Sequence, residues 1–250
     1  EWRADRASEG YTLVWSGNKT IRSLSRNHEA SWLACGTEDS GILMIPIDDD
    51  SVGYQLQDSS GIIMALAWSH NNKLYSAGSA GQVTEWDLVT RRGRSVITDA
   101  AGIKGLEISD EGTMLAVLTS DGRVLCRKAD SPQKPVTLIA GENTITTHKF
   151  IPGGERLATG DETGLIEVWN TATGKEEGNA EGHLTPVRCI TFDRTDGQML
   201  SADDAGEIRL WTLANLSQPP VIFTDGEKAV IRLAFSDGGD AFLSATRTDV

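Results

Sequence analysis

The hydrophobic residues of this 250-residue chain alternate with polar residues over short segments, and turn-forming residues separate the segments. A period of two places successive side chains on opposite faces of a strand, whereas clusters of Gly, Asp, Asn and Pro are typical of turns. Helical periodicity is nearly absent. The pattern therefore predicts an all-β protein built from groups of four short strands. In the clearest group the expected strands are Val187–Phe192, Met199–Ala202, Glu207–Thr212 and Pro220–Phe223.

One phrase recurs along the chain: small or polar residues, a glycine, then alternating apolar residues that often end on tryptophan. The aligned glycines are Gly41, Gly81, Gly122, Gly164 and Gly206, at spacings of 40, 41, 42 and 42 residues. Such a period is the signature of folds that stack one small unit many times. We predict five complete repeats at about 17–57, 58–98, 99–140, 141–181 and 182–225, with partial repeats at 1–16 and 226–250.

Three repeats place tryptophan at the end of the third strand, as Glu85-Trp86-Asp87, Val168-Trp169-Asn170 and Leu210-Trp211-Thr212. Together with Gly182-His183 before a strand and the turn Ser109–Gly112, these residues resemble the WD40-repeat family. The resemblance covers nearly the whole chain and implies a β-propeller of four-stranded antiparallel blades around a central channel. The residue pattern agrees, because one such sheet cannot bury both apolar faces, whereas a ring of sheets does.

The number of blades follows from length. Dividing 250 residues by a mean spacing of about 41 gives about six. Strand patterns at Val230–Phe235 and Ala241–Ala245, with Glu1-Trp2 and Tyr11–Trp15 at the start, would together complete a sixth blade. We therefore expect a single six-bladed propeller over residues 1–250. The alternative is a seven-bladed ring of which this chain is a part, or a longer protein with further covalently attached domains.

The resemblance also implies structural roles, because the family buries a hydrogen-bonded tetrad of His, Ser or Thr, a turn Asp and Trp. The turn Asp should stand six residues before the Trp, but these positions hold Ala80, Thr163 and Ala205. Asp121 fits, in a repeat with Arg127 in place of Trp. We therefore expect no complete tetrad, and stability from apolar packing between blades. The expected structural residues are Trp86, Trp169, Trp211, His183, Gly81, Gly164 and Gly206.

The chain carries no sequence signature of catalysis: no GxSxG elbow, no P-loop, no GxGxxG after a strand and no HExxH. Its four histidines fall in different repeats without the spacing of metal ligands. Its three cysteines are an odd number with no close pair, and their apolar context predicts buried free thiols. We expect a non-enzyme with no cofactor and no metal site. These residues are His28, His70, His148 and His183, and Cys35, Cys126 and Cys189.

The chain is acidic, with 36 Asp and Glu against 23 Lys and Arg and a net charge of -13. This surplus argues against binding to nucleic acid or an anionic membrane. The basic cluster Arg91-Arg92-Gly93-Arg94 lacks the aromatic platform of a nucleic-acid site. No apolar run approaches the ~20 residues of a membrane helix. The resemblance to the WD40-repeat family implies protein or peptide as the partner class.

Propeller topology places loops from fourth to first strands, and from second to third strands, on one face, here called the top face. Acidic residues outnumber basic ones in these loops, so we expect the top face to receive a basic segment. The candidate partner-binding residues are Glu38, Asp39, Asp58, Asp99, Asp121, Glu142, Asp161, Glu162, Glu181, Asp203, Asp204 and Asp225.

These features favour a non-catalytic interaction scaffold or sensor module that binds a protein or peptide on a propeller face. One alternative is a regulatory, ligand-sensing domain of a longer signalling protein. The other is an enzyme with a site in the central channel. Free thiols point to a cytoplasmic location.

Overall fold

The computed structural model is all-β in the part of the chain that it describes. Its strands form five four-stranded sheets and two two-stranded sheets, which fits the expected count of about six. By its internal contacts the chain divides into two compact units, residues 1–103 and 104–250. The described residues are 3–4, 11–12, 19–29, 31–47, 52–57, 61–69, 71–98, 100–129, 131, 135–138, 143–195, 197–224, 228–236 and 238–246.

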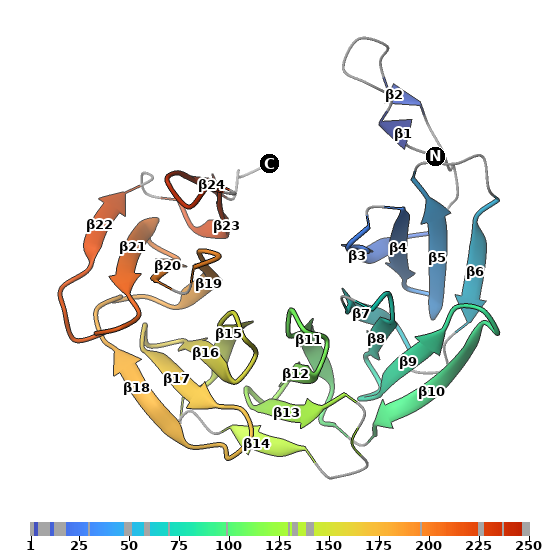
Figure 1. Cartoon of the computed structure of the whole chain (residues 1–250), viewed down its shortest axis with the longest axis horizontal. Helices are drawn as coiled ribbons and strands as arrows, with labels where there is room; N and C mark the ends of the chain where they lie inside the picture. The colour runs from blue at the N-terminus through green and yellow to red at the C-terminus, as the bar shows by residue number, and fades with distance from the viewer. Residues whose placement is uncertain are drawn as a thin grey trace. The chain divides into compact units, whose positions relative to one another are not determined.

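The first unit holds two four-stranded sheets whose strands pair in chain order (Figure 1). One comprises β3 (Ile21–Arg26), β4 (Trp32–Thr37), β5 (Gly41–Pro46) and β6 (Tyr54–Gln57). The other comprises β7 (Ile63–Trp68), β8 (Leu74–Gly78), β9 (Val83–Asp87) and β10 (Arg92–Ile97). A separate hairpin pairs β1 (Arg3–Ala4) with β2 (Tyr11–Thr12). The strand expected at Glu1-Trp2 lies outside the described residues.

The second unit holds three four-stranded sheets that follow one another side by side (Figure 1). The first comprises β11 (Ile103–Ile108), β12 (Met114–Thr119), β13 (Val124–Lys128) and β14 (Val136–Leu138). The second comprises β15 (Ile145–Phe150), β16 (Arg156–Asp161), β17 (Ile166–Asn170) and β18 (Glu176–Ala180). The third comprises β19 (Val187–Phe192), β20 (Gln198–Asp203), β21 (Glu207–Thr212) and β22 (Val221–Thr224). A two-stranded sheet pairs β23 (Val230–Phe235) with β24 (Phe242–Thr246). The bounds of β19, β21 and β23 coincide with the predicted strands.

First strands carry a β-bulge close to their start, and the bulge helps to join neighbouring sheets. The register shifts between Ile145 and Thr147 in β15, and between Val187 and Cys189 in β19. Thr146 Oγ1 donates to the carbonyl of Val187 at 2.6 Å, and Cys189 Sγ donates to the carbonyl of Val230 at 3.7 Å. A bulge re-aims a side chain locally, and here it turns a small polar group towards the next sheet of the same unit.

The tryptophans of the repeats pack between their own sheet and the preceding one. Trp86 lies in one apolar cluster with Ile42 and Leu56 of the preceding sheet. Trp211 likewise lies with Ile151 and Ile166. Their exposed fractions are 4% and 2%. Apolar packing between neighbouring sheets, which the sequence predicted as the main source of stability, is therefore present within each unit.

Candidate protein-interaction site

The predicted partner-binding acids lie where second and third strands meet and where one sheet leads to the next. In the first unit these are Glu38 and Asp39, in the β4–β5 turn. In the second unit they are Asp121 (β12–β13 turn), Asp161 (end of β16), Glu162 (β16–β17 turn), Glu181 (before β19), Asp203 (end of β20) and Asp204 (β20–β21 turn). Asp58, Asp99, Glu142 and Asp225 lie outside the described residues.

Two of these acids pair with an arginine from the first strand of their own sheet. Arg22 Nε donates to Glu38 Oε1 at 2.6 Å, and Arg188 Nε donates to Asp204 Oδ1 at 2.5 Å. Both pairs join residues 16 apart in sequence. Each arginine is the second residue of its strand, so its side chain reaches the turn beyond the second strand. The spacing of 16 residues between arginine and acid is the signal of this pairing in the sequence. A count of charges in each loop does not show it, because the arginine belongs to a strand.

Two further acids are neutralised by nearby basic side chains. Lys19 Nζ lies 2.7 Å from Asp39 Oδ2, and Arg123 Nε donates to Asp121 Oδ2 at 2.9 Å. Hydrogen bonds from these bases lower the pKa of both carboxyl groups. Within each unit, part of the predicted acidic surplus is therefore compensated locally, and less of it is free for a partner.

Asp161 and Asp203 are buried, with exposed fractions of 1% and 2%. Asp161 Oδ1 accepts the backbone N–H groups of the residues two and four positions ahead at 2.8 and 2.9 Å. Asp203 Oδ1 does the same in the next sheet at 3.1 and 2.9 Å. Side-chain bonds of this kind close a tight turn. Their assignment as partner-binding residues was therefore wrong, because a partner on the surface does not reach them.

A buried polar network joins His183 to the second and third strands of its own sheet. His183 Nε2 lies 2.7 Å from Ser201 Oγ, which also accepts the Trp211 Nε1–H at 2.8 Å. Asp203 Oδ2 lies 3.3 Å from His183 Nδ1. The prediction that no repeat assembles all four tetrad members was therefore wrong. The aspartate stands eight residues before the tryptophan rather than six, at the end of β20 instead of in the turn.

The other two tryptophans keep a part of this network. Trp86 Nε1 donates to Ser76 Oγ, and Trp169 Nε1 donates to Thr159 Oγ1, both at 2.9 Å. In each case the acceptor stands ten residues before the tryptophan, as Ser201 stands before Trp211. A buried indole N–H needs a partner, and the second strand supplies it in all three sheets.

Turn glycines bring the loops of neighbouring sheets together. Gly81, Gly164 and Gly206 have φ angles of 85°, 96° and 85°, which other residues rarely adopt. A Cβ on Gly164 would lie 2.2 Å from the carbonyl oxygen of His183. The β16–β17 turn therefore packs closely against the loop that carries His183. Only glycine at position 164 permits this close contact between the two backbones.

Three segments of the second unit meet at one edge through these contacts. They are the turn 161–164, the loop 181–186 and the turn 203–206. Ala205 N–H donates to Thr185 Oγ1 at 3.2 Å, and Asp204 N–H donates to the Pro186 carbonyl at 3.1 Å. This edge is called the rim below. Its exposed residues are Glu162, Thr163, Glu181, Leu184 and Ala205, and Asp204 is half-buried.

Leu184 is the unusual member of the rim, because 92% of its surface is exposed although the side chain is large and apolar. Glu162 and Glu181 are exposed on the segments that adjoin its loop. An exposed apolar side chain with carboxylates around it is chemically suited to a partner that offers a cation and an apolar group. The charge pattern of the sequence predicted the two glutamates but not Leu184, because an exposed leucine has no signal in the charge of a loop.

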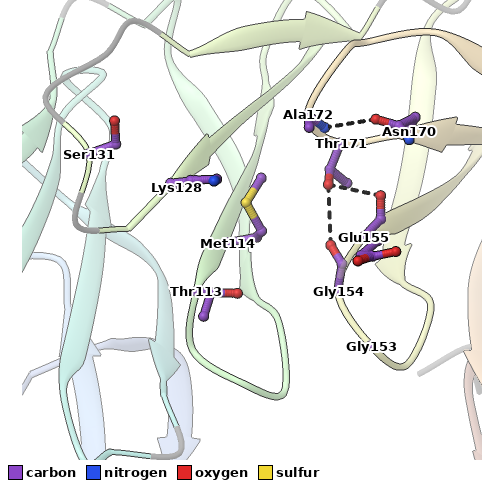
Figure 2. Close-up of a pocket in the computed structure, with 10 residues that line it drawn as sticks. All are labelled: Thr113, Met114, Lys128, Ser131, Gly153, Gly154, Glu155, Asn170, Thr171 and Ala172. Carbon is purple, nitrogen blue, oxygen red and sulfur yellow. Dashed lines mark hydrogen bonds between the residues drawn. The ribbon is translucent and has the colours of Figure 1, made fainter.

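A groove lies at the opposite edge of two sheets of this unit, with a volume of about 910 Å³. Figure 2 shows Met114 and Lys128 on one wall, at the start of β12 and the end of β13. The other wall holds Thr171, whose Oγ1 donates to the carbonyls of Gly154 and Glu155 at 3.2 and 3.0 Å. The size suits a short peptide segment or a small molecule. It is the second candidate surface.

The described side chains offer little for nucleophilic chemistry. Burial raises the pKa of Cys35 to about 11 and that of Cys126 to about 12, and it raises the pKa of Cys189 to about 12. All three thiols are free and buried, as predicted. Burial also lowers the pKa of His148 and of His183, and nearby acidic groups oppose the shift in part. His70 lies outside the described residues.

Known proteins resemble this chain in one repeat and in fold. The family model described as "WD domain, G-beta repeat" matches residues 174–212, which contain His183 and Trp211. A solved structure, "Crystal structure of Myceliophteria_thermophila Cps50 (Swd1) beta-propeller domain", superposes with a TM-score of 0.78 at 18% identity, covering 93% of this chain and 83% of that one. The chain therefore carries a WD40 repeat at residues 174–212 and resembles WD40-repeat proteins in fold. The four-stranded antiparallel sheets are WD40-type propeller blades, so the predicted fold class is confirmed.

Curated relatives are similar to this chain over more than half of its length. The serine-threonine kinase receptor-associated protein of Gallus gallus is 23% identical over 213 residues, which are 84% of this chain and 59% of the relative. The target of rapamycin complex subunit wat1 of Schizosaccharomyces pombe is 27% identical over 150 residues, which are 59% of this chain and 48% of the relative. The chain thus spans about half to three fifths of the length of these relatives. None of the described segments forms a helix with the length and apolar character to cross a membrane.

Proposed function

We propose that this protein is a non-catalytic interaction scaffold whose rim receives a basic segment that carries an apolar side chain. The rim, on which Leu184, Glu162 and Glu181 are all exposed, carries the proposal. Burying one leucine on association contributes about 1.5–3 kcal/mol, and carboxylates around it select a positively charged partner and speed the encounter. Asp204 contributes less to the attraction of a basic partner, because its carboxylate already accepts a hydrogen bond from Arg188.

The relatives support the general class. One is named for its association with a kinase receptor and another as a subunit of a complex, so both names describe proteins that bind other proteins. Fold alone does not assign a function. The proposal therefore rests on the rim, and the relatives support protein as the partner class.

Charge reversal of the rim tests the proposal. The tagged full chain is used as bait, and captured proteins are quantified by mass spectrometry at low and high salt. A Glu162→Lys/Glu181→Lys variant is expected to lose at least about tenfold of its captured partner at low salt, since about 1.4 kcal/mol of lost attraction is tenfold in affinity. Leu184→Ser is expected to weaken the capture at both salt concentrations, because apolar burial is not screened.

The control variant is Glu29→Lys/Glu111→Lys, which makes the same charge change in two turns between first and second strands. It should capture the partner as the unmodified chain does. Capture that survives both rim variants, or that a Lys128→Glu change in the groove abolishes instead, would overturn the rim as the binding surface.

A further inference from the structure

The hairpin of β9 and β10 in the first unit carries a local excess of positive charge. Its turn and its second strand hold Arg91, Arg92 and Arg94, in a chain whose net charge is -13. Arg94 Nη2 donates to Glu85 Oε2 at 2.9 Å, and Lys73 Nζ lies 3.3 Å from the other oxygen of that carboxylate. Arg91 and Arg92 are exposed, and no described acid forms an ion pair with either. Two guanidinium groups are therefore available at the tip of this hairpin.

Arg91 occupies a backbone position that favours glycine, since its φ angle is 57°. The turn after β17 is built in the same way. Asn170 Oδ1 accepts the N–H groups two and three residues ahead there, as Asp87 Oδ1 does in the β9–β10 turn. Four residues after Asn170 stands Gly174, with φ of 70°, whereas four residues after Asp87 stands Arg91. Glycine would close this hairpin with less strain, so the arginine needs an explanation.

The guanidinium of Arg91 lies over an aromatic ring of the preceding sheet. Its Cζ is 4.2 Å from the centroid of the Tyr54 ring, at the start of β6. Trp32 packs against the same ring, with the two centroids 5.5 Å apart. The prediction that the arginine cluster lacks an aromatic platform was therefore wrong, because a residue from another sheet supplies one. Stacking fixes the plane of a guanidinium and leaves its N–H groups pointing outward at the edge.

We propose that the tip of this hairpin binds an acidic peptide segment of a partner protein, with Arg91 and Arg92 as receptors for its carboxylates. An arginine whose plane is fixed can bind a carboxylate through two parallel hydrogen bonds. Val89 is 93% exposed in the same turn, so an apolar side chain beside the carboxylates of the peptide would have a contact there. The proposal is independent of the rim, which takes a partner of the opposite charge.

A nucleic acid suits the tip less well than a peptide does. Base stacking needs an open aromatic face, and Arg91 lies over the ring of Tyr54. The net charge of -13 repels a long polyphosphate, whereas a short acidic segment interacts mainly with the nearby arginines, because salt screens the more distant charges. Only the peptide also supplies an apolar group for Val89.

Fluorescence anisotropy tests the site, with the full chain titrated into a fluorescein-labelled peptide of the sequence EELEELEE. Arg91→Gly is expected to weaken binding by at least about tenfold at low salt, because it removes the fixed guanidinium. This variant should fold, since glycine suits the left-handed turn. Arg91→Lys keeps the charge but loses the planar, stacked group, so it is expected to weaken binding by at least about threefold.

Lys175→Gln is the matched control, because it removes one positive charge from the equivalent turn after β17, where Lys175 is exposed. It should bind the peptide as the unmodified chain does. The absence of saturable, salt-dependent binding would overturn the site, as would equal binding by Arg91→Gly and Lys175→Gln. Full-strength binding by Arg91→Lys would overturn the role of the stacked guanidinium. A single-stranded oligonucleotide that binds more tightly than the peptide and is lost in Arg91→Gly would overturn the ligand class.

A basic peptide of the sequence KKLKKLKK separates this proposal from the one made for the rim. It should bind Arg91→Gly as it binds the unmodified chain, and Glu162→Lys/Glu181→Lys should weaken it without weakening the acidic peptide. Failure of the hairpin tip and failure of the rim are therefore distinguishable.

Discussion

Replacement of Trp211 by alanine is expected to lower the free energy of unfolding by about 3–5 kcal/mol, as large-to-small changes in a packed core do. Trp211 is 2% exposed and lies in one apolar cluster with Ile151, Ile166 and Met199. The change opens a cavity between two sheets and leaves Ser201 Oγ without the indole N–H. The same change at Trp169, which is 6% exposed, has the same expected cost.

Denaturant unfolding of the variant measures this cost, with Trp211→Phe as the partial control. Phenylalanine keeps most of the volume and loses the hydrogen bond to Ser201, so it should cost less than alanine. Leu184→Ala is the matched exposed control and should stay within about 0.5 kcal/mol of the unmodified chain. An alanine variant with unchanged unfolding would contradict the placement of Trp211 between the sheets.

Stability is expected to fall as pH rises from about 4.5 to about 7, because of Glu167. Burial raises the pKa of this β17 carboxyl to about 7, and repulsion from Glu176 and Asp161 adds to the shift. The folded chain therefore holds the proton more tightly than the unfolded chain, whose glutamates titrate near 4.3. The stabilisation is fully present below that value and is lost as pH passes through 7, at a cost of up to about 3 kcal/mol.

Glu167→Gln should remove this part of the pH dependence, since glutamine has the shape of the protonated side chain and does not ionise. Chemical unfolding at pH 5 and pH 8 measures it: the variant should match the unmodified chain at pH 5 and exceed its stability at pH 8. Glu177→Gln, an exposed acid on the adjacent strand β18, is the control. Equal effects of the two substitutions at pH 8 would show that net charge, and not the burial of Glu167, is responsible.

The repeat and its strands were predictable from the sequence because both depend on local patterns. The strands β19, β21 and β23 have their predicted bounds, since alternation and turn residues act over a few neighbouring positions. The burial of the cysteines also followed from their apolar context.

The partners of the charged residues were not predictable from loop assignments. Arg188 belongs to a strand by its sequence position, yet its long side chain reaches Asp204 in a turn. The loop assignment predicted Asp203 as a surface acid, but the residue is buried and accepts hydrogen bonds from backbone N–H groups of its own turn. A side chain from another strand occupies Asp204, and backbone N–H groups of its own turn occupy Asp203. Counting charges by loop contains neither piece of information.

By itself, the amino-acid sequence determined the all-β class, the period of about 41 residues and the tryptophan positions, because these depend on alternation and spacing along the chain. Only the tertiary structure decided that His183, Asp203 and Glu207 meet, and that Leu184 stands exposed. The physical reason is distance along the chain. These groups are separated by up to 24 residues, and the return of each strand to the same edge of its sheet brings them together.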